Sequence, residues 1–197
     1  AESLFIAWAG TVIGAIFSFP ISFIAASNVS TNSVSKIIKQ FLNLIRAFPE
    51  LILAFVLLPV TGLGPLTGTL AVGIHSIGTL GKLSSEVIEG IDEGPLESIK
   101  SSGGSKINEL LFGVVPQVMP TITSYWLYRF EINLRASAVL GIVGAGGVGA
   151  ELINQLRFRD FPRAGTVLVV TILMVLIVDT ISASIRRRII KGRTIKV

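Results

Sequence analysis

The chain has 197 residues, of which 51% are hydrophobic and only 15% are charged, and it contains no cysteine and one histidine. A soluble domain carries about a quarter charged residues. Here the charge is missing from long runs, which indicates a bilayer rather than a large soluble core. Lack of cysteine excludes disulfides and thiolate metal sites, and His75 alone cannot make a zinc site. We expect no metal or cofactor on this chain, and no nucleic-acid partner despite the net charge of +5.

Five apolar segments are long enough to cross a bilayer as helices, which takes about 20 residues each. They cover 4–26, 42–60, 66–83, 110–143 and 165–185. Helices are expected because lipid cannot satisfy an open backbone, and the run at 167–178 does not alternate as a barrel strand would. Gly10 and Gly14 have the spacing that allows close helix contact. The sequence predicts an all-α fold, a polytopic transmembrane helical bundle with about five spans, as one domain over 1–197.

Basic residues gather in three regions, namely the stretch before the second span, the loop at about 84–109 with its edge, and the C-terminal tail. They are Lys36, Lys39, Arg46, Lys82, Lys100, Lys106, Arg186, Arg187, Arg188, Lys191, Arg193 and Lys196. Five crossings put all three regions on one face, which the positive-inside rule makes cytoplasmic. This predicts a multi-pass protein of the bacterial plasma membrane with a cytoplasmic C-terminus. Because Ala1 then lies outside, we expect a further helix before it.

The polar loop predicts two short helices joined by a glycine turn. Pro95 suits the first turn of a helix and Glu97 suits the positive end of its dipole. Gly103 and Gly104 break that helix, and the hydroxyl of Ser105 caps the next one. Such a knob at the membrane surface can dock in a groove of another protein; an ordinary connecting loop is the alternative.

The same loop resembles the "EAA" loop of bacterial ABC importer permeases. That pattern is Glu-Ala-Ala, three residues, Gly, nine residues, then Ile-x-Leu-Pro. This chain keeps the spacing and the Glu, Gly and Pro, but Ser and Ile replace the two alanines, and Gly113 and Val115 replace the Ile and Leu. The resemblance implies a coupling segment that sits on a dimer of ATP-binding subunits, which hold the ATP and Mg. Its residues are Pro95, Glu97, Ser98, Ile99, Gly103, Gly104 and Pro116.

Three charged residues, Arg129, Glu131 and Arg135, lie inside the fourth apolar segment. A charge at that depth is costly, so these side chains should face protein or water. Glu131 and Arg135 are four apart and are predicted to pair on one helix face, whereas Arg129 is about 120° away from Arg135 and keeps its charge. A guanidinium beside a pathway suits an anionic substrate such as a phosphate-like oxyanion. An interhelical ion pair that only fixes packing is the alternative.

Two other polar residues within the apolar segments are expected to make structural contacts. His75, in the third segment, is predicted to hydrogen-bond a neighbouring helix. Asp179, near the cytoplasmic end of the last segment, is predicted to pair with Arg186 or with a partner chain.

Residues 144–149, GAGGVG, fit the G-x-G-x-x-G pattern of dinucleotide-binding proteins. That fingerprint needs a βαβ unit and an acid about 20 residues on, but the segment that follows has membrane length. A dinucleotide-binding membrane protein therefore remains a remote alternative. We expect Gly144, Gly146 and Gly147 instead to break a helix where the backbone lines a substrate pathway.

The stretch YRFEINLRASAVLGIVGAGGVG, with VVPQVMP before it, is similar to permeases of phosphonate and phosphite importers. This resemblance covers essentially the whole chain and implies a type I ABC importer permease fold. It also implies transport of a small phosphorus oxyanion, no catalysis on this chain, a second permease copy and a substrate-binding protein. Methionine-type permeases, which share the five-helix layout and a glycine-rich tract, are the alternative.

Overall fold

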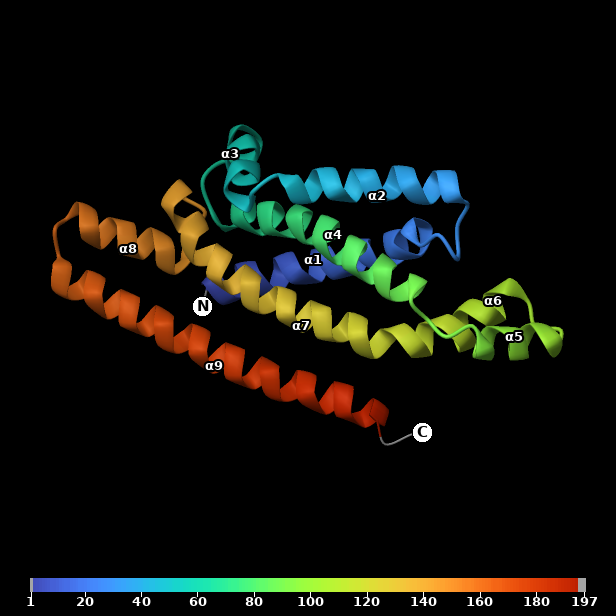
Figure 1. Ribbon diagram of the computed structural model, residues 1–197. Helices are drawn as coiled ribbons and strands as arrows, with labels where there is room; N and C mark the ends of the chain where they lie inside the picture. Colours follow the sequence, from blue (N-terminus) through green and yellow to red (C-terminus); the bar gives the residue numbers. More distant parts are fainter. Residues whose placement is uncertain (1, 195–197) are drawn as a thin grey trace.

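The computed structural model describes the backbone of residues 2–194 and the side chains of residues 2–190, so Lys196 of the basic tail lies outside the described residues. Within this part the chain is helical and contains no strand, which confirms the all-α prediction (Figure 1). The elements are α1 (Glu2–Ala25), α2 (Asn32–Ala47), α3 (Glu50–Thr61), α4 (Pro65–Glu89), α5 (Gly94–Ser101), α6 (Lys106–Asn108), η1 (Glu109–Val114, a π-helix), α7 (Val115–Leu140), η2 (Gly141–Val143, a 3₁₀ turn), α8 (Gly147–Arg157) and α9 (Phe161–Thr194).

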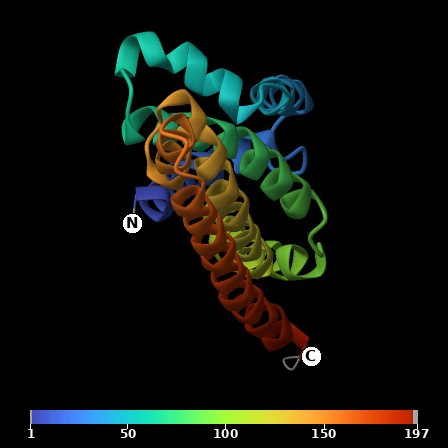
Figure 2. The same ribbon diagram turned by 90° about the vertical axis from the view of Figure 1, so that its left-hand side faces the viewer.

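The helix α4 lies at the centre of the bundle and packs against α1, α2, α3 and α7, while α9 packs against α7 and α8 (Figure 2). The short helices α5 and α6 project at one end, towards which the C-terminus of α9 also points (Figure 1). The start of α1 and the helix α8 lie at the other end. The loop at 84–109 and the tail therefore share one end of the molecule, as their basic residues predicted.

Three helical stretches are long and apolar enough to cross a membrane: Glu2–Ala25, Lys106–Val143 and Phe161–Ile190. These match the first, fourth and fifth predicted spans. The predicted span 42–60 is wrong as a single helix, because α2 and α3 meet at an angle of 87° and count as a fourth span only when taken together. Pro49 cannot donate a helical hydrogen bond and forces the preceding Phe48 into an extended conformation, with φ −86° and ψ 120°. The basic stretch with Lys36, Lys39 and Arg46 is therefore itself helical and belongs to α2.

The predicted third span forms the helix α4, but α4 is not apolar enough to count as a membrane-crossing helix by composition. Its buried positions are mostly small or hydroxyl-bearing residues: Thr67, Gly68, Thr69, Ala71, Val72, Gly73, Ser76, Gly78, Leu80, Gly81, Ser84, Ser85 and Ile88. Helices that approach closely inside a membrane favour such residues. The low hydropathy of α4 follows from its place inside the bundle, where it faces other helices.

Helices α1 and α4 pack closely against each other. An added Cβ atom at Gly14 would lie 2.4 Å from the Cβ atom of Ser76, and one at Gly10 would lie 2.9 Å from a methyl group of Val72. The small-residue spacing on α1 therefore has the packing role that the sequence predicted.

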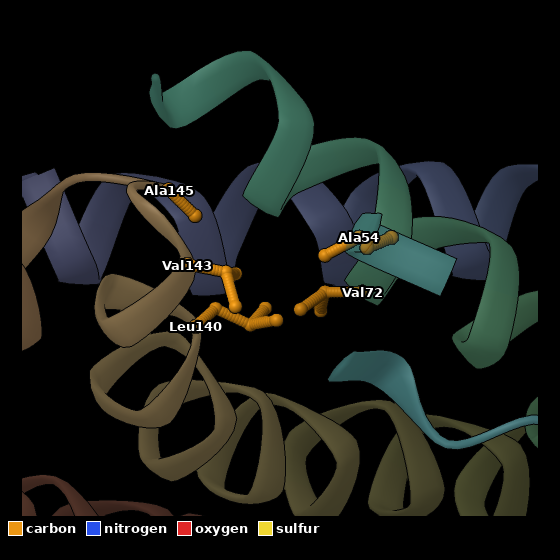
Figure 3. Close-up of a cluster of buried hydrophobic side chains, with 6 residues drawn as sticks. Ala54, Val72, Leu140, Val143 and Ala145 are labelled. Atoms are coloured by element: carbon orange, nitrogen blue, oxygen red, sulfur yellow. The ribbon is translucent and has the colours of Figure 1, made fainter. Parts of the chain in front are cut away.

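A small apolar cluster holds the start of the glycine tract and α3 against α4 (Figure 3). Ala54 of α3 and Val72 of α4 meet Leu140, Val143 and Ala145 there, together with Ala71. The cluster therefore sets the position of α3, whose first residue is Glu50.

Replacing Gly14 by alanine is expected to destabilise the protein by about 1–3 kcal/mol, the usual range for overpacking, because the new methyl group collides with Ser76. Gly165→Ala is the matched control, since Gly165 has no atom within 4 Å of its added Cβ position. Thermal unfolding of the purified protein in detergent measures both. Equal melting temperatures for the two variants would contradict the close contact.

Candidate functional site

The predicted coupling segment forms the expected helix–turn–helix. Pro95 stands at the start of α5, Glu97 lies in its first turn, and Gly103 has a left-handed φ of +77° that ends it. The hydroxyl oxygen of Ser105 accepts a hydrogen bond of 3.4 Å from the backbone N–H of Asn108, which confirms the predicted cap. The second helix does not stop, however, but continues from α6 through the π-helix into α7, with Pro116 in its first turn.

Two departures from the EAA pattern compensate each other. Ile99 stands where the pattern has a small alanine, and Gly113 stands where it has a bulky isoleucine. The side chain of Ile99 lies over two glycines, because an added Cβ atom at Gly113 would be 3.3 Å from its Cδ1 atom and one at Gly104 would be 2.5 Å from its Cγ2 atom. Leu96 of α5 also fills the space beside Gly113, with its Cδ1 atom 3.1 Å from the added Cβ position, so the turn remains filled.

A surface groove of about 460 Å³ lies on this turn. It is lined by Ser98, Ile99, Ser102, Gly104, Asn108 and Phe112. Phe112, which lines it, and Ile107 of α6 are 71% and 67% exposed. Large exposed apolar side chains around a concave surface are typical of a protein-binding site.

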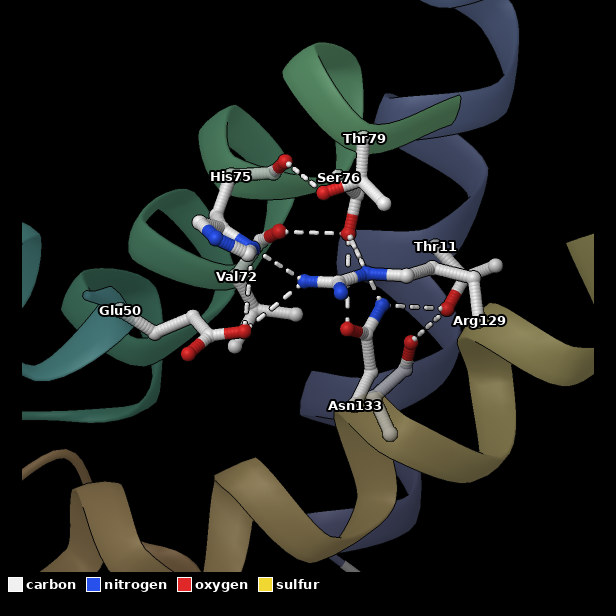
Figure 4. Close-up of polar contacts among 9 residues, drawn as sticks. Thr11, Glu50, Val72, His75, Ser76, Thr79, Arg129 and Asn133 are labelled. Atoms are coloured by element: carbon white, nitrogen blue, oxygen red, sulfur yellow. Dashed lines mark hydrogen bonds and ion pairs between the residues drawn. The ribbon is translucent and has the colours of Figure 1, made fainter. Parts of the chain in front are cut away.

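The second candidate site surrounds Arg129 of α7, whose side chain is only 5% exposed (Figure 4). Its Nη2 atom donates to Oε1 of Glu50 at 2.9 Å and to Nδ1 of His75 at 2.5 Å, and its Nε atom donates to Oγ of Ser76 at 3.0 Å. His75 Nδ1 accepts in this arrangement, because an arginine only donates. Oε1 of Glu50 also lies 3.0 Å from Nδ1 of His75. Groups from α3, α4 and α7 therefore meet at one guanidinium.

Asn133, one turn further along α7, extends this network to α1. Its Nδ2 atom donates to Oγ1 of Thr11 at 2.8 Å and to Oγ of Ser76 at 3.0 Å. Both hydroxyl groups donate in turn to carbonyls of their own helices, Thr11 to Ala7 at 2.6 Å and Ser76 to Val72 at 2.7 Å. The buried polar groups are satisfied by one another, which is what makes such a network tolerable inside an apolar bundle.

The structure corrects the expectation that Arg129 keeps an unpaired charge, because Glu50 neutralises it. Sequence reasoning missed Glu50, Ser76, Asn133 and Thr11. A signal for Glu50 was present, since a single acid directly after a proline within an apolar run requires a partner. The prediction that His75 hydrogen-bonds a neighbouring helix is confirmed, and Arg129 is its donor.

The other two charges of α7 face α9. Glu131 pairs with Arg186 at 3.0 Å and Arg135 pairs with Asp179 at 2.7 Å, so the predicted pairing of Glu131 with Arg135 is wrong. Asp179 likewise pairs with Arg135 rather than with Arg186. The guanidinium of Arg186 also lies 5.5 Å from the ring centre of Tyr128. These contacts lie away from the Arg129 network, on the side of α7 that α9 covers.

The glycine tract breaks the helix as predicted. Gly144, Gly146 and Gly147 have φ values of +77°, +79° and +75°, which only glycine adopts at low cost. Gly149 is packed so closely that an added Cβ atom would lie 1.8 Å from the carbonyl oxygen of Ala138. Because the described residues contain no strand, no βαβ unit surrounds the tract, and the dinucleotide-binding alternative is wrong.

The tract leads into α8, whose first residues are hydrogen-bonded to the start of α1. The backbone N–H of Gly147 donates to Oε2 of Glu2 and that of Val148 to Oγ of Ser3, both at 2.9 Å. A pocket of about 370 Å³ lies at this contact. It is lined by Glu2, Ser3, Gly147, Val148, Glu151, Thr166, Val167 and Val170.

Residues 18–193 match the family of binding-protein-dependent transport system inner membrane components. The chain belongs to this family. It is therefore a transport component rather than an enzyme, and the match covers the coupling turn and all of the Arg129 network except Thr11.

Two relatives are permeases of importers for phosphorus oxyanions. The phosphite transport system permease protein PtxC of Stutzerimonas stutzeri is 39% identical over 187 residues, which are 94% of this chain and 68% of that protein. The phosphate-import permease protein PhnE of Mycolicibacterium smegmatis is 40% identical over 191 residues, which are 96% of this chain and 36% of that protein. The chain thus spans about two thirds of the first relative and about a third of the second.

The solved structure of the MetNI methionine ABC transporter in inward-facing conformations contains a similar chain, with a TM-score of 0.82. The two chains are 18% identical, and the likeness covers 95% of this chain and 93% of that one. This likeness confirms the predicted importer-permease fold. At 18% identity the methionine-type protein is a more distant relative than the two oxyanion permeases.

Replacing Asn133 by leucine is expected to destabilise the permease by about 1–3 kcal/mol, because the hydroxyl groups of Thr11 and Ser76 lose their shared donor inside the bundle. Asn154→Leu is the matched control, since Asn154 is exposed on α8. Thermal unfolding in detergent compares the two. A melting temperature for Asn133→Leu as high as that of the control would show that the network does not hold α1 to α7.

Proposed function

We propose that this chain is the membrane-spanning subunit of an ATP-driven importer for a small phosphorus oxyanion, phosphite or a phosphonate. The observation that carries the proposal is the nearly buried guanidinium of Arg129 at the meeting point of α3, α4 and α7. A guanidinium inside a membrane bundle matches the oxygens of a phosphorus oxyanion. Relatives at 39% and 40% identity carry the names of phosphite and phosphate importers, which supports the same substrate class.

The partners follow from the ends of the bundle. Two copies of the chain form the permease, and a dimer of ATP-binding subunits, which holds ATP and Mg, docks on residues 97–116. The groove on this turn and the exposed side chains of Ile107 and Phe112 support that docking. This end is the cytoplasmic one in a bacterial inner membrane, because basic residues gather there. A substrate-binding protein delivers the anion to the opposite end.

Transport requires no bond to be made or broken on this chain. Closure of the ATP-binding subunits moves α5 and α6, and the continuous helix from Lys106 to Val143 carries that movement to Arg129. The anion enters past the glycine tract, where Gly144, Gly146 and Gly147 expose backbone. It meets Arg129 next, while Glu131 and Arg135 keep α9 in place beside the pathway.

Proteoliposomes that contain the permease, its cognate ATP-binding subunit and its binding protein should take up radiolabelled phosphite only when ATP is present at the ATP-binding subunits. Arg129→Gln should lower that uptake by about tenfold or more, because one charge-assisted contact contributes about 1.5–3 kcal/mol. Arg135→Gln is the control; its side chain is 53% exposed and it pairs with α9. Uptake without ATP, or uptake of methionine in place of phosphite, would overturn the proposal.

Glu97→Lys and Gly103→Pro are each expected to reduce the amount of ATP-binding subunit that co-purifies with the permease. The first reverses an exposed charge on the proposed docking surface, and the second forces a negative φ on a residue that needs +77°. Glu151→Lys, an exposed change at the opposite end, should leave the recovery unchanged. Full recovery with both coupling variants would exclude the turn as the docking surface.

A further inference from the structure

The contact between Arg129 and Glu50 uses only half of each group. Nη2 of Arg129 meets Oε1 of Glu50, whereas Nη1 and Oε2 take part in none of the hydrogen bonds found among residues 2–190. Arginine and carboxylate form their strongest contacts as two parallel hydrogen bonds. Nη1 of Arg129 is therefore available as a further donor. A tetrahedral oxyanion in place of the Glu50 carboxylate would accept hydrogen bonds from both Nη1 and Nη2 with two of its oxygens.

The two partners are anchored very differently. Arg129 and Ser76 are 4% and 0% exposed and lie on α7 and α4, within the core of the bundle. Glu50 is 24% exposed at its side chain and is the first residue of α3, a helix in which Ala54 is the one buried position and Leu51, Leu53 and Leu57 pack only partly buried against the apolar cluster. An element with few buried contacts moves at low cost. The carboxylate of Glu50 is therefore on the less buried helix, α3, whereas the cation of Arg129 is on α7, within the core of the bundle.

Movement of Glu50 away from Arg129 leaves a positive charge in the bundle without its counter-ion. An unpaired buried charge is costly, more so in a membrane than in water. His75 does not replace the carboxylate as counter-ion, because an imidazole side chain carries no negative charge. The vacated position therefore requires another anion of similar size, placed against Arg129, His75 and Ser76.

We infer that Glu50 is a resident carboxylate that occupies an oxyanion site at Arg129, and that the transported anion and Glu50 exclude each other from it. The inference rests on the proposed function for the class of anion. Departure of Glu50 carries α3 away from α4, so the position of α3 reports whether the site holds an anion. While α3 packs against α4, the Glu50 carboxylate occupies the site and no other anion binds there.

The test measures phosphite binding to the permease–ATP-binding complex in nanodiscs, without binding protein, by equilibrium dialysis. Glu50→Gln keeps the shape of the side chain and removes its charge, so it should lower the Kd for phosphite by about tenfold or more. The reason is that the apparent affinity of the site for phosphite falls with the fraction of time for which the Glu50 carboxylate occupies it. Adding Arg129→Gln should abolish the gain. Glu50→Asp, which retains the competing charge, should stay near the wild-type Kd.

Asp179→Asn is the matched control, because Asp179 also pairs with an arginine of α7 but on the α9 side, and it should leave the Kd unchanged. Damage to the fold weakens binding, so a gain in affinity separates competition from a structural role. If the wild-type complex imports phosphite but Glu50→Gln binds it no more tightly, the resident carboxylate is excluded and the proposed function stands. If the wild-type complex neither imports nor binds phosphite, the proposed function itself fails.

A second measurement leaves Glu50 and Arg129 intact. Spin labels at Phe55 of α3 and Val139 of α7, which are 54% and 51% exposed, report the distance between the two helices. Saturating phosphite should lengthen this distance in the complex. An unchanged distance in a complex that binds phosphite would overturn the inference even where the Glu50 variants do not assemble.

Discussion

The requirement to neutralise one nearly buried guanidinium organises the centre of this bundle. Arg129 takes Glu50 from α3 and Ser76 from α4, and Asn133 carries the same network to α1. The break at Pro49 is part of this solution, because α3 turns by 87° there and Glu50 stands in its first turn. A straight helix through 42–60 would continue past α4 along the axis of α2. The charge and the bend therefore depend on each other.

On the opposite side of α7, two further charged residues form ion pairs with α9. At 100° per residue, Glu131 and Arg135 are about 40° apart on α7 and share one face. Asp179 and Arg186 are seven residues apart on α9, which is nearly two full turns, so they share a face as well. The helices run antiparallel (Figure 1), and each acid meets the base of the other helix. Glu131 is nearly buried in its pair, whereas Arg135 and Asp179 are 53% and 33% exposed. Two pairs at different heights therefore fix the register of α9 against α7.

The sequence was sufficient for features that depend on local rules. Pro95, Gly103 and Ser105 specify the coupling turn through φ values and capping, and the three apolar stretches follow from hydropathy alone. The shared face of Glu131 and Arg135 was also correct, but their pairing was not, because helical spacing does not reveal that α9 presents the opposite charges. The Glu50–Arg129 pair joins positions 79 residues apart and depends on the 87° bend. Hydropathy alone does not mark α4 as a span, because its buried positions carry mostly small and hydroxyl-bearing residues.

The coupling turn and the Arg129 site belong to one continuous helical stretch, and this fixes how they can communicate. From Lys106 to Arg129 the chain rises by about 35 Å at 1.5 Å per residue, without a proline-induced break of the kind seen at Pro49. The exchange of volume between Ile99 and Gly113 keeps α5 seated on the start of this stretch. At its far end the stretch stops at Gly144, where the backbone turns left-handed. A push on α5 therefore shifts α7 as a unit, whereas α3 is separated from α2 by the Pro49 break and packs on α4 mainly through Ala54 and partly buried leucines. Relative movement between α7 and α3 is where such a push has least resistance, and that boundary is the one that the Arg129–Glu50 pair spans.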